Sequence, residues 1–263
     1  MSRTDLGDLF VQMGPPHTSE AIILRARAYG ESDKIVTFLT EDAGKLTGIA
    51  KGAKNSRRRF ANCLDPFTKV RVHFRVRPGA SLVFMDSCDL LLSPAALTTP
   101  TKFAYGSYLL ELVDQFTAEA QPVREIYLLL AEGLDELGCA AATGTFLRIF
   151  ELRLLHHTGY EPRLTSCVEC RRPVAALDHA FLDATRGSIV CTTCGARGQS
   201  LLPVSGETLA ELDAIKTATF ADARLRRFTA ATATEAAQLM GLLMAQHLPR
   251  PLRSVKLIAA LAR

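Results

Sequence analysis

Residues 69–77 have the sequence Lys69-Val-Arg-Val-His-Phe-Arg-Val-Arg77, in which polar and apolar side chains alternate without interruption. This alternation predicts a half-buried β-strand, because successive side chains of a strand point to opposite faces. We therefore expect one face to enter a core and the other to form an outward basic row. The inward set is Val70, Val72, Phe74 and Val76, and the outward set is Lys69, Arg71, His73, Arg75 and Arg77.

This strand ends a basic window that runs from Lys45 to Arg77. The window holds ten lysine and arginine residues and one acid, Asp65, whereas the whole chain has a net charge of +4. The rest of the chain is therefore net negative, and the basic charge is local. Outward residues repeat at about 6.5–7 Å along a strand, which suits contact with a phosphate backbone. The candidate phosphate-binding residues are Lys45, Lys51, Lys54, Arg57, Arg58, Arg59, Lys69, Arg71, Arg75 and Arg77.

An outward basic row has a second explanation, since charged residues also prevent the aggregation of exposed sheet edges. However, residues 51–60, the basic loop, are basic as well, and their glycine, asparagine and serine predict a mobile loop. Such a loop beside a basic strand favours a polyanion site, most often for nucleic acid. Because Phe60, Phe67 and Tyr29 are expected to pack in the core or in turns, we expect binding led by phosphate contacts and sensitive to salt.

Around this strand the sequence predicts a small β-barrel. Strands are expected over residues 21–28, 34–40, 45–50, 69–77 and about 81–92, joined mostly by hairpins, with Gly44 at one turn. Five short strands in close succession predict a closed or nearly closed barrel of the oligonucleotide-binding (OB) type. Residues 1–19 lack periodicity and are expected to be a flexible extension, which places the barrel domain at 20–94.

The chain then changes to helical periodicity. Apolar residues three and four positions apart predict three helices, the third over Thr145–His157 with Gly159 as its stop. We expect a helical domain in two parts, 95–163 and 201–263, on either side of a cysteine-rich module at 164–200. Basic residues of this domain are candidate contacts for an acidic peptide, although ordinary solvated positions are an alternative. They are Arg148, Arg153, Arg253 and Lys256.

The cysteine-rich module contains Cys167-Val-Glu-Cys170 and Cys191-Thr-Thr-Cys194, with twenty residues between the two pairs. Two such pairs at this spacing predict a tetrahedral four-thiolate zinc site, with iron or a vacant site as alternatives. Protein ligands fill all four positions, so we expect one structural zinc ion. The other cysteines, Cys63, Cys88 and Cys139, are expected to be isolated, buried apolar residues.

The predicted fold class is therefore multidomain α+β: an N-terminal OB-fold β-barrel, then a mainly helical domain that carries an inserted four-cysteine zinc module. No apolar run reaches the roughly 20 residues of a membrane helix, and we expect a cytoplasmic protein with no membrane partner. Because phosphate-loop, nucleophile-elbow, His-Glu-x-x-His and dinucleotide motifs are absent, no catalytic residue is assigned. A zinc-dependent nucleic-acid enzyme and a zinc-ribbon transcription or translation factor remain alternatives.

Several segments also match a known family. They are Ala21-Ile-Ile-Leu-Arg25, Tyr29-Gly-Glu-Ser-Asp33-Lys-Ile-Val36, Gly44-Lys-Leu46, Ala50-Lys-Gly-Ala53, Leu64-Asp-Pro-Phe67 and Gly159-Tyr-Glu-Pro162. Together these segments resemble the bacterial RecO recombination mediator proteins. The resemblance implies an OB domain, a helical domain and a zinc module, of which this sequence keeps all four cysteines. It also implies a nucleoid-associated protein that binds single- and double-stranded DNA and anneals complementary strands without ATP. The implied protein partners are RecR, single-stranded DNA-binding protein and, indirectly, RecA.

Overall fold

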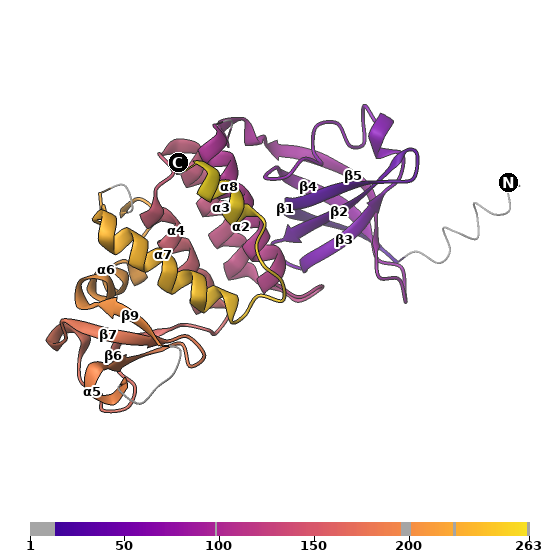
Figure 1. The fold of residues 1–263 in the computed structure, drawn as a ribbon. Helices are drawn as coiled ribbons and strands as arrows, with labels where there is room; N and C mark the ends of the chain where they lie inside the picture. Colours follow the sequence, from indigo (N-terminus) through magenta and orange to yellow (C-terminus); the bar gives the residue numbers. More distant parts are fainter. Residues whose placement is uncertain (1–13, 98, 196–200, 223–224, 262–263) are drawn as a thin grey trace, which may run out of the picture. The chain divides into compact units, whose positions relative to one another are not determined.

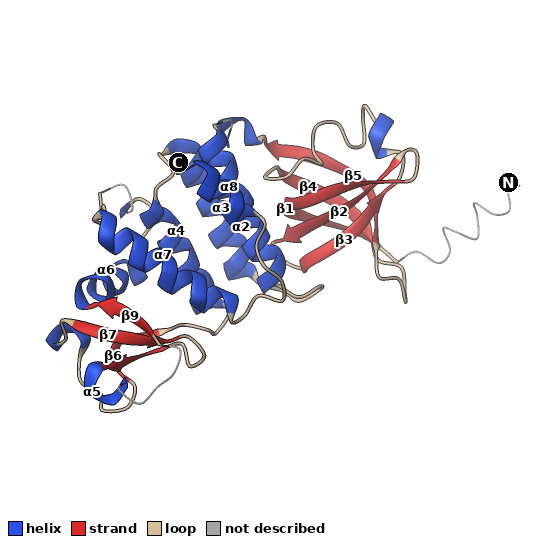
Figure 2. Ribbon diagram, viewed as in Figure 1, coloured by secondary structure: helices blue, strands red, loops and turns tan. Residues whose placement is uncertain are grey.

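The computed structural model describes residues 14–97, 99–195, 201–222 and 225–261. The chain forms two compact units. The first contains the described residues up to Leu97 together with Leu110–Leu134, and the second contains Thr99–Leu109 and the described residues from Asp135 onwards. A five-stranded sheet comes first in the chain and most helices follow, so the fold is mixed α+β, as predicted (Figures 1 and 2).

The sheet of the first unit is a closed barrel. Its strands are β1 (Pro16–Tyr29), β2 (Asp33–Thr40), β3 (Gly44–Ala50), β4 (Lys69–Arg75) and β5 (Val83–Leu92). They follow the order β1-β2-β3-β5-β4, and neighbours are antiparallel except for the parallel pair β3 and β5. The long strand β1 closes the barrel because its first half pairs with β4 and its second half with β2. The short helix η2 (Pro94–Leu97) follows the barrel.

The alternation that predicted β4 is seen in its burial. Val70, Val72 and Phe74 lie in the barrel core, while the residues between them are partly or fully exposed. Val76, which the sequence placed in the core, is 44% exposed. That prediction is wrong because β4 ends at Arg75, so the regular alternation of faces does not continue to residue 76.

The barrel also begins earlier than the sequence predicted. β1 starts at Pro16, which pairs with Arg75, and Ser19 pairs with Val72. Residues 16–19 are therefore part of the barrel rather than of an extension, because backbone pairing with β4 orders a segment that has no apolar periodicity of its own. Residues 1–13 of the predicted extension lie outside the described residues.

Gly44 begins β3 directly after the β2–β3 turn, and its φ of +74° lies in the left-handed region that favours glycine. A Cβ atom at this position would lie 1.9 Å from the carbonyl oxygen of Gln121, in the segment that follows helix α2 (Pro100–Phe116). That segment is tied to the hairpin by the amide of Ala120, which donates to the Lys45 carbonyl oxygen at 2.8 Å. A distant segment, as well as the turn, therefore requires glycine here.

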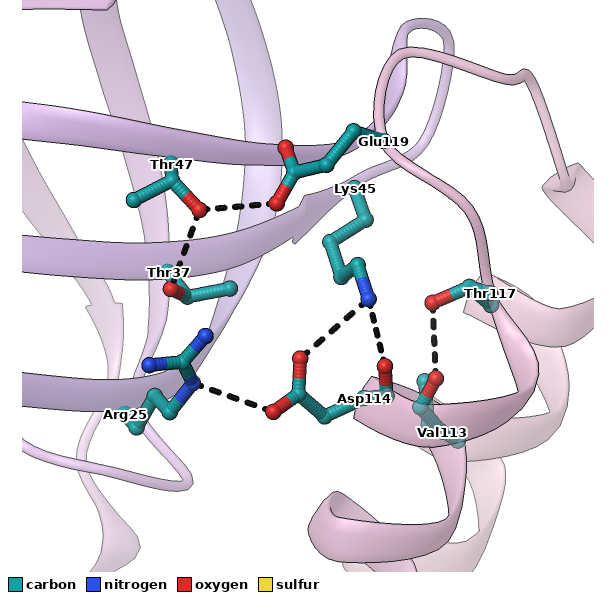
Figure 3. Close-up of polar contacts among 8 residues, drawn as sticks. All are labelled: Arg25, Thr37, Lys45, Thr47, Val113, Asp114, Thr117 and Glu119. Atoms are coloured by element: carbon teal, nitrogen blue, oxygen red, sulfur yellow. Dashed lines mark hydrogen bonds and ion pairs between the residues drawn. The ribbon is translucent and has the colours of Figure 1, made fainter. Parts of the chain in front are cut away.

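Asp114, in the last turn of α2, contacts two strands of the barrel (Figure 3). The Nε atom of Arg25 donates to its carboxylate at 3.0 Å. The Lys45 Nζ atom lies 3.3 Å from the other carboxylate oxygen and also donates to the Asp114 carbonyl oxygen. The Lys45 and Asp114 side chains are each only 10% exposed. Such a pair stabilises the unit while both partners remain, because loss of Lys45 leaves the nearly buried Asp114 carboxylate with fewer compensating contacts.

Helices α2, α3 (Arg124–Cys139) and α4 (Gly144–His157) match the three predicted helices. The hydroxyl of Thr143 accepts from the amide of Phe146 and caps α4 at its start. Gly159, at φ +79°, follows its end, as the sequence predicted. Phe146 and Phe150 from α4 pack against Phe220, so this helix lies within the core of the second unit.

The cysteine module is a four-stranded sheet with the order β6-β8-β7-β9. Its elements are β6 (Arg163–Cys167), η3 (Val174–Ala176), β7 (His179–Asp183), β8 (Ser188–Cys191), α5 (Thr192–Gly195) and β9 (Leu202–Ser205). The last strand falls in the part that the sequence assigned to the helical domain, because β9 is completed by pairing with β7 and has little signal of its own. Helices α6 (Gly206–Lys216), α7 (Ala230–Ala245) and α8 (Ser254–Leu261) follow. Among the described residues, no helix is both long and apolar enough to span a membrane.

We expect Gly44→Ala to lower the free energy of unfolding by at least about 3 kcal/mol, because it adds a clash with Gln121 to a left-handed backbone. Gly30→Ala is the matched control, since Gly30 has φ +56° but an added Cβ would meet nothing within 4 Å. We expect that control to lose only about 1–2 kcal/mol. Urea denaturation measures both losses, and equal values would contradict the close approach of Gln121.

Candidate nucleic-acid interface and metal centre

The outward basic row of β4 faces acidic side chains of the two strands beside it. Glu20 comes from β1, and Asp86 and Asp89 come from β5. A phosphate group would have to compete with these carboxylates for the row, so the row is less cationic than its sequence suggests. The contacts are Lys69–Glu20, Arg71–Glu20, His73–Asp89 and Arg75–Asp86, with N–O distances of 3.0, 3.8, 3.0 and 2.9 Å.

The first half of the basic loop is anchored to the turn between β1 and β2. The Lys51 Nζ atom lies 2.8 Å from the carboxylate of Asp33, which also accepts from the Gly52 amide at 2.8 Å. The hydrogen bond from Lys51, followed by that from Gly52, lowers the pKa of Asp33. Lys54 donates to the carbonyl oxygens of Gly30 and Glu31 at 2.7 and 3.0 Å. Lys51 and Lys54 therefore hold the loop in place.

Arg59 anchors the second half of the basic loop. Its guanidinium group donates to the Lys51 carbonyl oxygen at 2.8 Å and lies 5.2 Å from the centre of the Phe60 ring. Its own carbonyl oxygen accepts from the amide of Cys88, in β5, at 2.8 Å. The short helix η1 (Ala53–Asn55) adds local order. A mobile loop was predicted, but the structure shows a loop fixed at both halves by hydrogen bonds to distant segments.

Arg57 and Arg58 differ from the other candidate residues of the basic loop. Both side chains are exposed, and neither makes a hydrogen bond or an ion pair with any residue that the structure describes. A cation without an intramolecular partner can meet a phosphate without first giving up a carboxylate. These two residues are therefore the strongest candidates for phosphate contact. Arg77, also exposed, follows the end of β4.

Lys45 is the candidate that the structure removes from the basic surface. The residue is 8% exposed, and its ammonium group points to Asp114 (Figure 3). The sequence could not show this because Asp114 is 69 residues away in the chain. The aromatic prediction holds for Phe60, which is 4% exposed in the barrel core, whereas Tyr29 is 50% exposed.

The four cysteines of the two Cys-x-x-Cys pairs come together in the second unit. Cys167 ends β6 and Cys191 ends β8, and these strands are neighbours in the sheet. All four Sγ atoms lie within 4.8 Å of one another, and those of Cys170 and Cys191 are 3.7 Å apart. A tetrahedral site with zinc–sulfur bonds of about 2.3 Å would place its sulfurs about 3.8 Å apart. The cluster, completed by Cys194, is therefore compatible with a metal ion.

Backbone amides prepare this cluster for metal binding. Burial disfavours the thiolate of Cys167, but amide hydrogen bonds from Cys170 and Cys191 outweigh burial and lower the pKa of Cys167 to about 6. The amide of Cys194 lowers the pKa of Cys191. Since the thiolate is the form that binds a metal ion, these two effects favour binding, whereas hydrogen bonds with the sulfurs of Cys191 and Cys170 raise the pKa of Cys194 to about 12. A metal ion would therefore have to displace the proton of Cys194.

The remaining cysteines depart from the prediction of isolated, buried residues. Cys63 and Cys88 are buried, but they are joined in a disulfide rather than isolated. Cys139, at the end of α3, is exposed. Sequence spacing gives no signal for the disulfide, because the 25-residue separation becomes a contact only when the barrel closes.

The four candidate contacts for an acidic peptide separate in the structure. Arg148 is buried and donates to Glu151 at 2.6 Å, so it is not available to a peptide. Burial raises the pKa of Glu151, and the positive charge of Arg148 opposes that shift. The guanidinium group of Arg153 lies 5.0 Å from the centre of the Phe220 ring. Arg253 and Lys256, at and near the start of α8, are exposed. Of the four candidates, Arg253 and Lys256 are the two that are exposed and close together in the chain.

An apolar groove of about 410 Å³ lies beside this pair. Sequence reasoning missed it, because its lining comes from α2, α7, α8 and the segment between the last two helices, and no local pattern marks a groove shared by several elements. The residues that matter here are Tyr108, Met244, Leu248, Arg250, Leu252 and Val255.

The chain matches two family models. Residues 13–94 match "Recombination protein O N terminal" and residues 97–256 match "Recombination protein O C terminal". A "DNA repair protein RecO" of Syntrophus aciditrophicus is 32% identical over 250 residues, which cover 94% of this chain and 96% of that protein. Proteins with the same name from Myxococcus xanthus and Geobacter metallireducens are 35% and 34% identical, covering 92% and 90% of this chain and 97% and 94% of their own.

We expect Lys45→Met to lower the free energy of unfolding by about 3 kcal/mol, because it removes one partner of a nearly buried pair. The double variant Lys45→Met/Asp114→Asn should lose less, since the desolvated carboxylate is gone as well. DNA affinity of the folded Lys45→Met protein should equal that of the wild type in fluorescence anisotropy. A clear loss of affinity at unchanged stability would return Lys45 to the DNA-binding surface.

We expect the purified chain to hold one metal ion per molecule, as measured by elemental analysis. Cys191→Ser should reduce that content to near zero, because the remaining three cysteines cannot complete a tetrahedral site. Cys139→Ser, an exposed cysteine outside the cluster, is the matched control and should leave the metal content unchanged. Full metal content in Cys191→Ser would show that the ion is bound elsewhere.

Proposed function

The chain belongs to the RecO family of DNA repair proteins, and from this premise we propose that it is a DNA-binding mediator of recombinational repair. It binds single- and double-stranded DNA and anneals complementary strands without ATP. Together with RecR it helps load RecA onto DNA coated by single-stranded DNA-binding protein. The protein acts without catalytic residues, in the cytoplasm and associated with the nucleoid.

The architecture of the barrel supports an OB-fold reading of the N-terminal domain. Five strands close in the order β1-β2-β3-β5-β4. OB domains are five-stranded barrels that bind oligonucleotides through strand faces and the loops beside them. The basic loop runs between β3 and β4, whereas the β1–β2 and β4–β5 loops are the usual OB contacts, so its proposed role rests on its charge rather than on its place in the barrel.

The observation that carries the proposal is the pair of exposed arginines, Arg57 and Arg58, on an anchored loop. The other cations of that loop hold the backbone in place, so these two side chains are presented without the cost of ordering the loop on binding. The ion-paired cations of β4 form a secondary surface. Phosphate contact reduces the repulsion between two DNA strands, and annealing then needs no ATP because base pairing supplies the free energy.

We assign the four-cysteine cluster to one structural zinc ion. Cys167, Cys170, Cys191 and Cys194 supply four thiolates, which suit zinc, and a complete protein shell leaves no open position for a catalytic water. Such an ion stabilises the small sheet β6-β8-β7-β9. Iron in the same thiolate site is the alternative that elemental analysis distinguishes.

The apolar groove beside α8 supports binding of the acidic, apolar-ended tail of single-stranded DNA-binding protein. Met244, Leu248 and Val255 offer a site for an apolar residue. Arg250, Arg253 and Lys256 offer positive charge in and near the groove for the acidic part. In this proposal, the contact between the helical domain and that tail brings the mediator to coated DNA. Of the four basic residues that the sequence suggested for an acidic peptide, Arg253 and Lys256 remain candidates.

We expect Arg57→Ala/Arg58→Ala to weaken binding of a single-stranded oligonucleotide and to slow annealing of two complementary strands. Loss of two phosphate contacts should reduce the slope of log affinity against log salt by about 1.4 to 1.8, because each contact releases a counterion. Fluorescence anisotropy and an annealing assay without nucleotide, both at low and moderate salt, measure these changes.

Arg71→Ala/Arg75→Ala is the matched control, because it removes the same charge from residues that already face carboxylates. We expect a smaller loss of affinity and a smaller change of slope than for the loop variant. If the two double variants behave alike, the ion pairs of β4 do not shield the row. If the loop variant retains wild-type binding and annealing, the basic loop is not the DNA-binding surface.

We expect an acidic peptide that ends in an apolar residue to bind the protein, and Val255→Asp to weaken that binding by about tenfold or more, because it places a like charge in the groove. Leu257→Asp is the control: Leu257 is exposed on the same helix but does not line the groove. Isothermal titration calorimetry measures both. Equal losses in the two variants would place the peptide elsewhere.

A further inference from the structure

Cys63 and Cys88 lie where the basic loop meets the wall of the barrel. Cys63 follows the loop closely in the chain, and Cys88 is in the middle of β5. The two sulfurs are bonded, and the residues are 0% and 4% exposed. The amide of Cys88 donates to the Arg59 carbonyl oxygen at 2.8 Å. The sulfur link and this backbone hydrogen bond therefore hold the same junction.

The two halves of the basic loop are held by different kinds of contact. Lys51 and Lys54 fix the first half through polar contacts with the turn between β1 and β2. The second half carries Arg57 and Arg58, and its anchors are Arg59 and the link between Cys63 and β5. A change at the two sulfurs therefore acts on the half that presents the exposed arginines.

We propose that Cys63 and Cys88 are a reversible thiol–disulfide pair whose oxidation fixes the Arg57–Arg58 segment against β5 and whose reduction loosens it. The effect on DNA rests on the proposed role of these arginines in binding. A covalent link removes conformations from the loop, so a loop that is ordered beforehand loses less entropy when it meets DNA. The pair is thus a modification site for two-electron oxidants and for thiol reductants.

The chemistry is a balanced two-electron exchange. The thiolate of one cysteine attacks hydrogen peroxide and breaks the oxygen–oxygen bond, which gives a sulfenic acid and one water after proton transfer. The second thiol then attacks that sulfur, forms the sulfur–sulfur bond and releases a second water. Two thiols and one peroxide become one disulfide and two waters. A dithiol reductant reverses the change by thiol–disulfide exchange and is itself oxidised.

Burial of both sulfurs limits the access of oxidants and reductants. Interconversion should therefore be slow on the timescale of DNA binding, so the two states can be prepared and compared. The exposed Cys139 and the four-cysteine cluster are chemically separate, and peptide mapping distinguishes a Cys63–Cys88 link from oxidation at those positions.

The experiment uses the full-length, metal-loaded protein, either kept in a dithiol reductant or treated with hydrogen peroxide and then freed of it. Mass spectrometry maps the linked peptides, hydrogen exchange follows residues 56–62, and anisotropy measures affinity for a single-stranded oligonucleotide. We expect the linked peptide, slower exchange and about three- to tenfold tighter DNA binding in the oxidised protein. Metal content is measured in each sample.

Two variants serve as controls. Cys63→Ala/Cys88→Ala should bind DNA equally under both conditions, and Cys139→Ser should respond as the wild type does. If the double variant does not fold, the two states of the wild type still give the comparison. Absence of the linked peptide, or equal exchange in both states, overturns the proposal. Altered exchange with unchanged DNA affinity supports the redox link and counts instead against the basic loop as a DNA-binding surface.

Discussion

The nearly buried contact of Asp114 with Lys45 and Arg25 is the constraint on which the first unit depends. It joins the end of α2 to β1 and β3, and the close approach of Gln121 to Gly44 lies beside it. Because both charges of the Lys45–Asp114 pair are largely removed from water, neither can be lost without leaving the other desolvated. A lysine in the basic window thus serves the structure and is not available for a nucleic acid.

The same principle decides which other cations remain available. In the folded barrel, acidic residues from outside the basic window lie beside its cations. Glu20 faces β4 from one side, and Asp86 and Asp89 face it from the other. Asp33 pairs with Lys51. Local charge along the chain therefore overstates the positive potential of the surface. Lys54 and Arg59 are used in contacts with backbone carbonyl oxygens of the described residues. Arg57 and Arg58 make no such contact there, and the anchored loop presents both side chains to solvent.

The cysteines show two different relations between sequence and structure. The Cys-x-x-Cys pairs can be recognised from local sequence as metal ligands, since each pair places two thiolates on one tight turn. Only the approach of the two pairs to each other depends on the fold. The Cys63–Cys88 pair has no such signal, because its members lie on a loop and a strand that are brought together by barrel closure. The cysteines of this protein therefore have two roles. The four-cysteine cluster suits a metal ion, and the Cys63–Cys88 pair links the end of the basic loop to β5.

The sequence by itself determined the five barrel strands, the three helices that follow them, the glycine turns, the alternation of β4, the two Cys-x-x-Cys pairs and the family resemblance. These features follow from local periodicity and spacing, which specify the face that each segment buries. Only the tertiary structure decided that β1 begins at Pro16, that Val76 is exposed, that Lys45 and Arg148 are committed to buried ion pairs, and that Cys63 meets Cys88. The Arg148–Glu151 pair is local to α4, and only the packing of the second unit buries it. Each of the others depends on a partner far away in the chain or on where a strand stops, and the register of the closed barrel rather than any local pattern selects it.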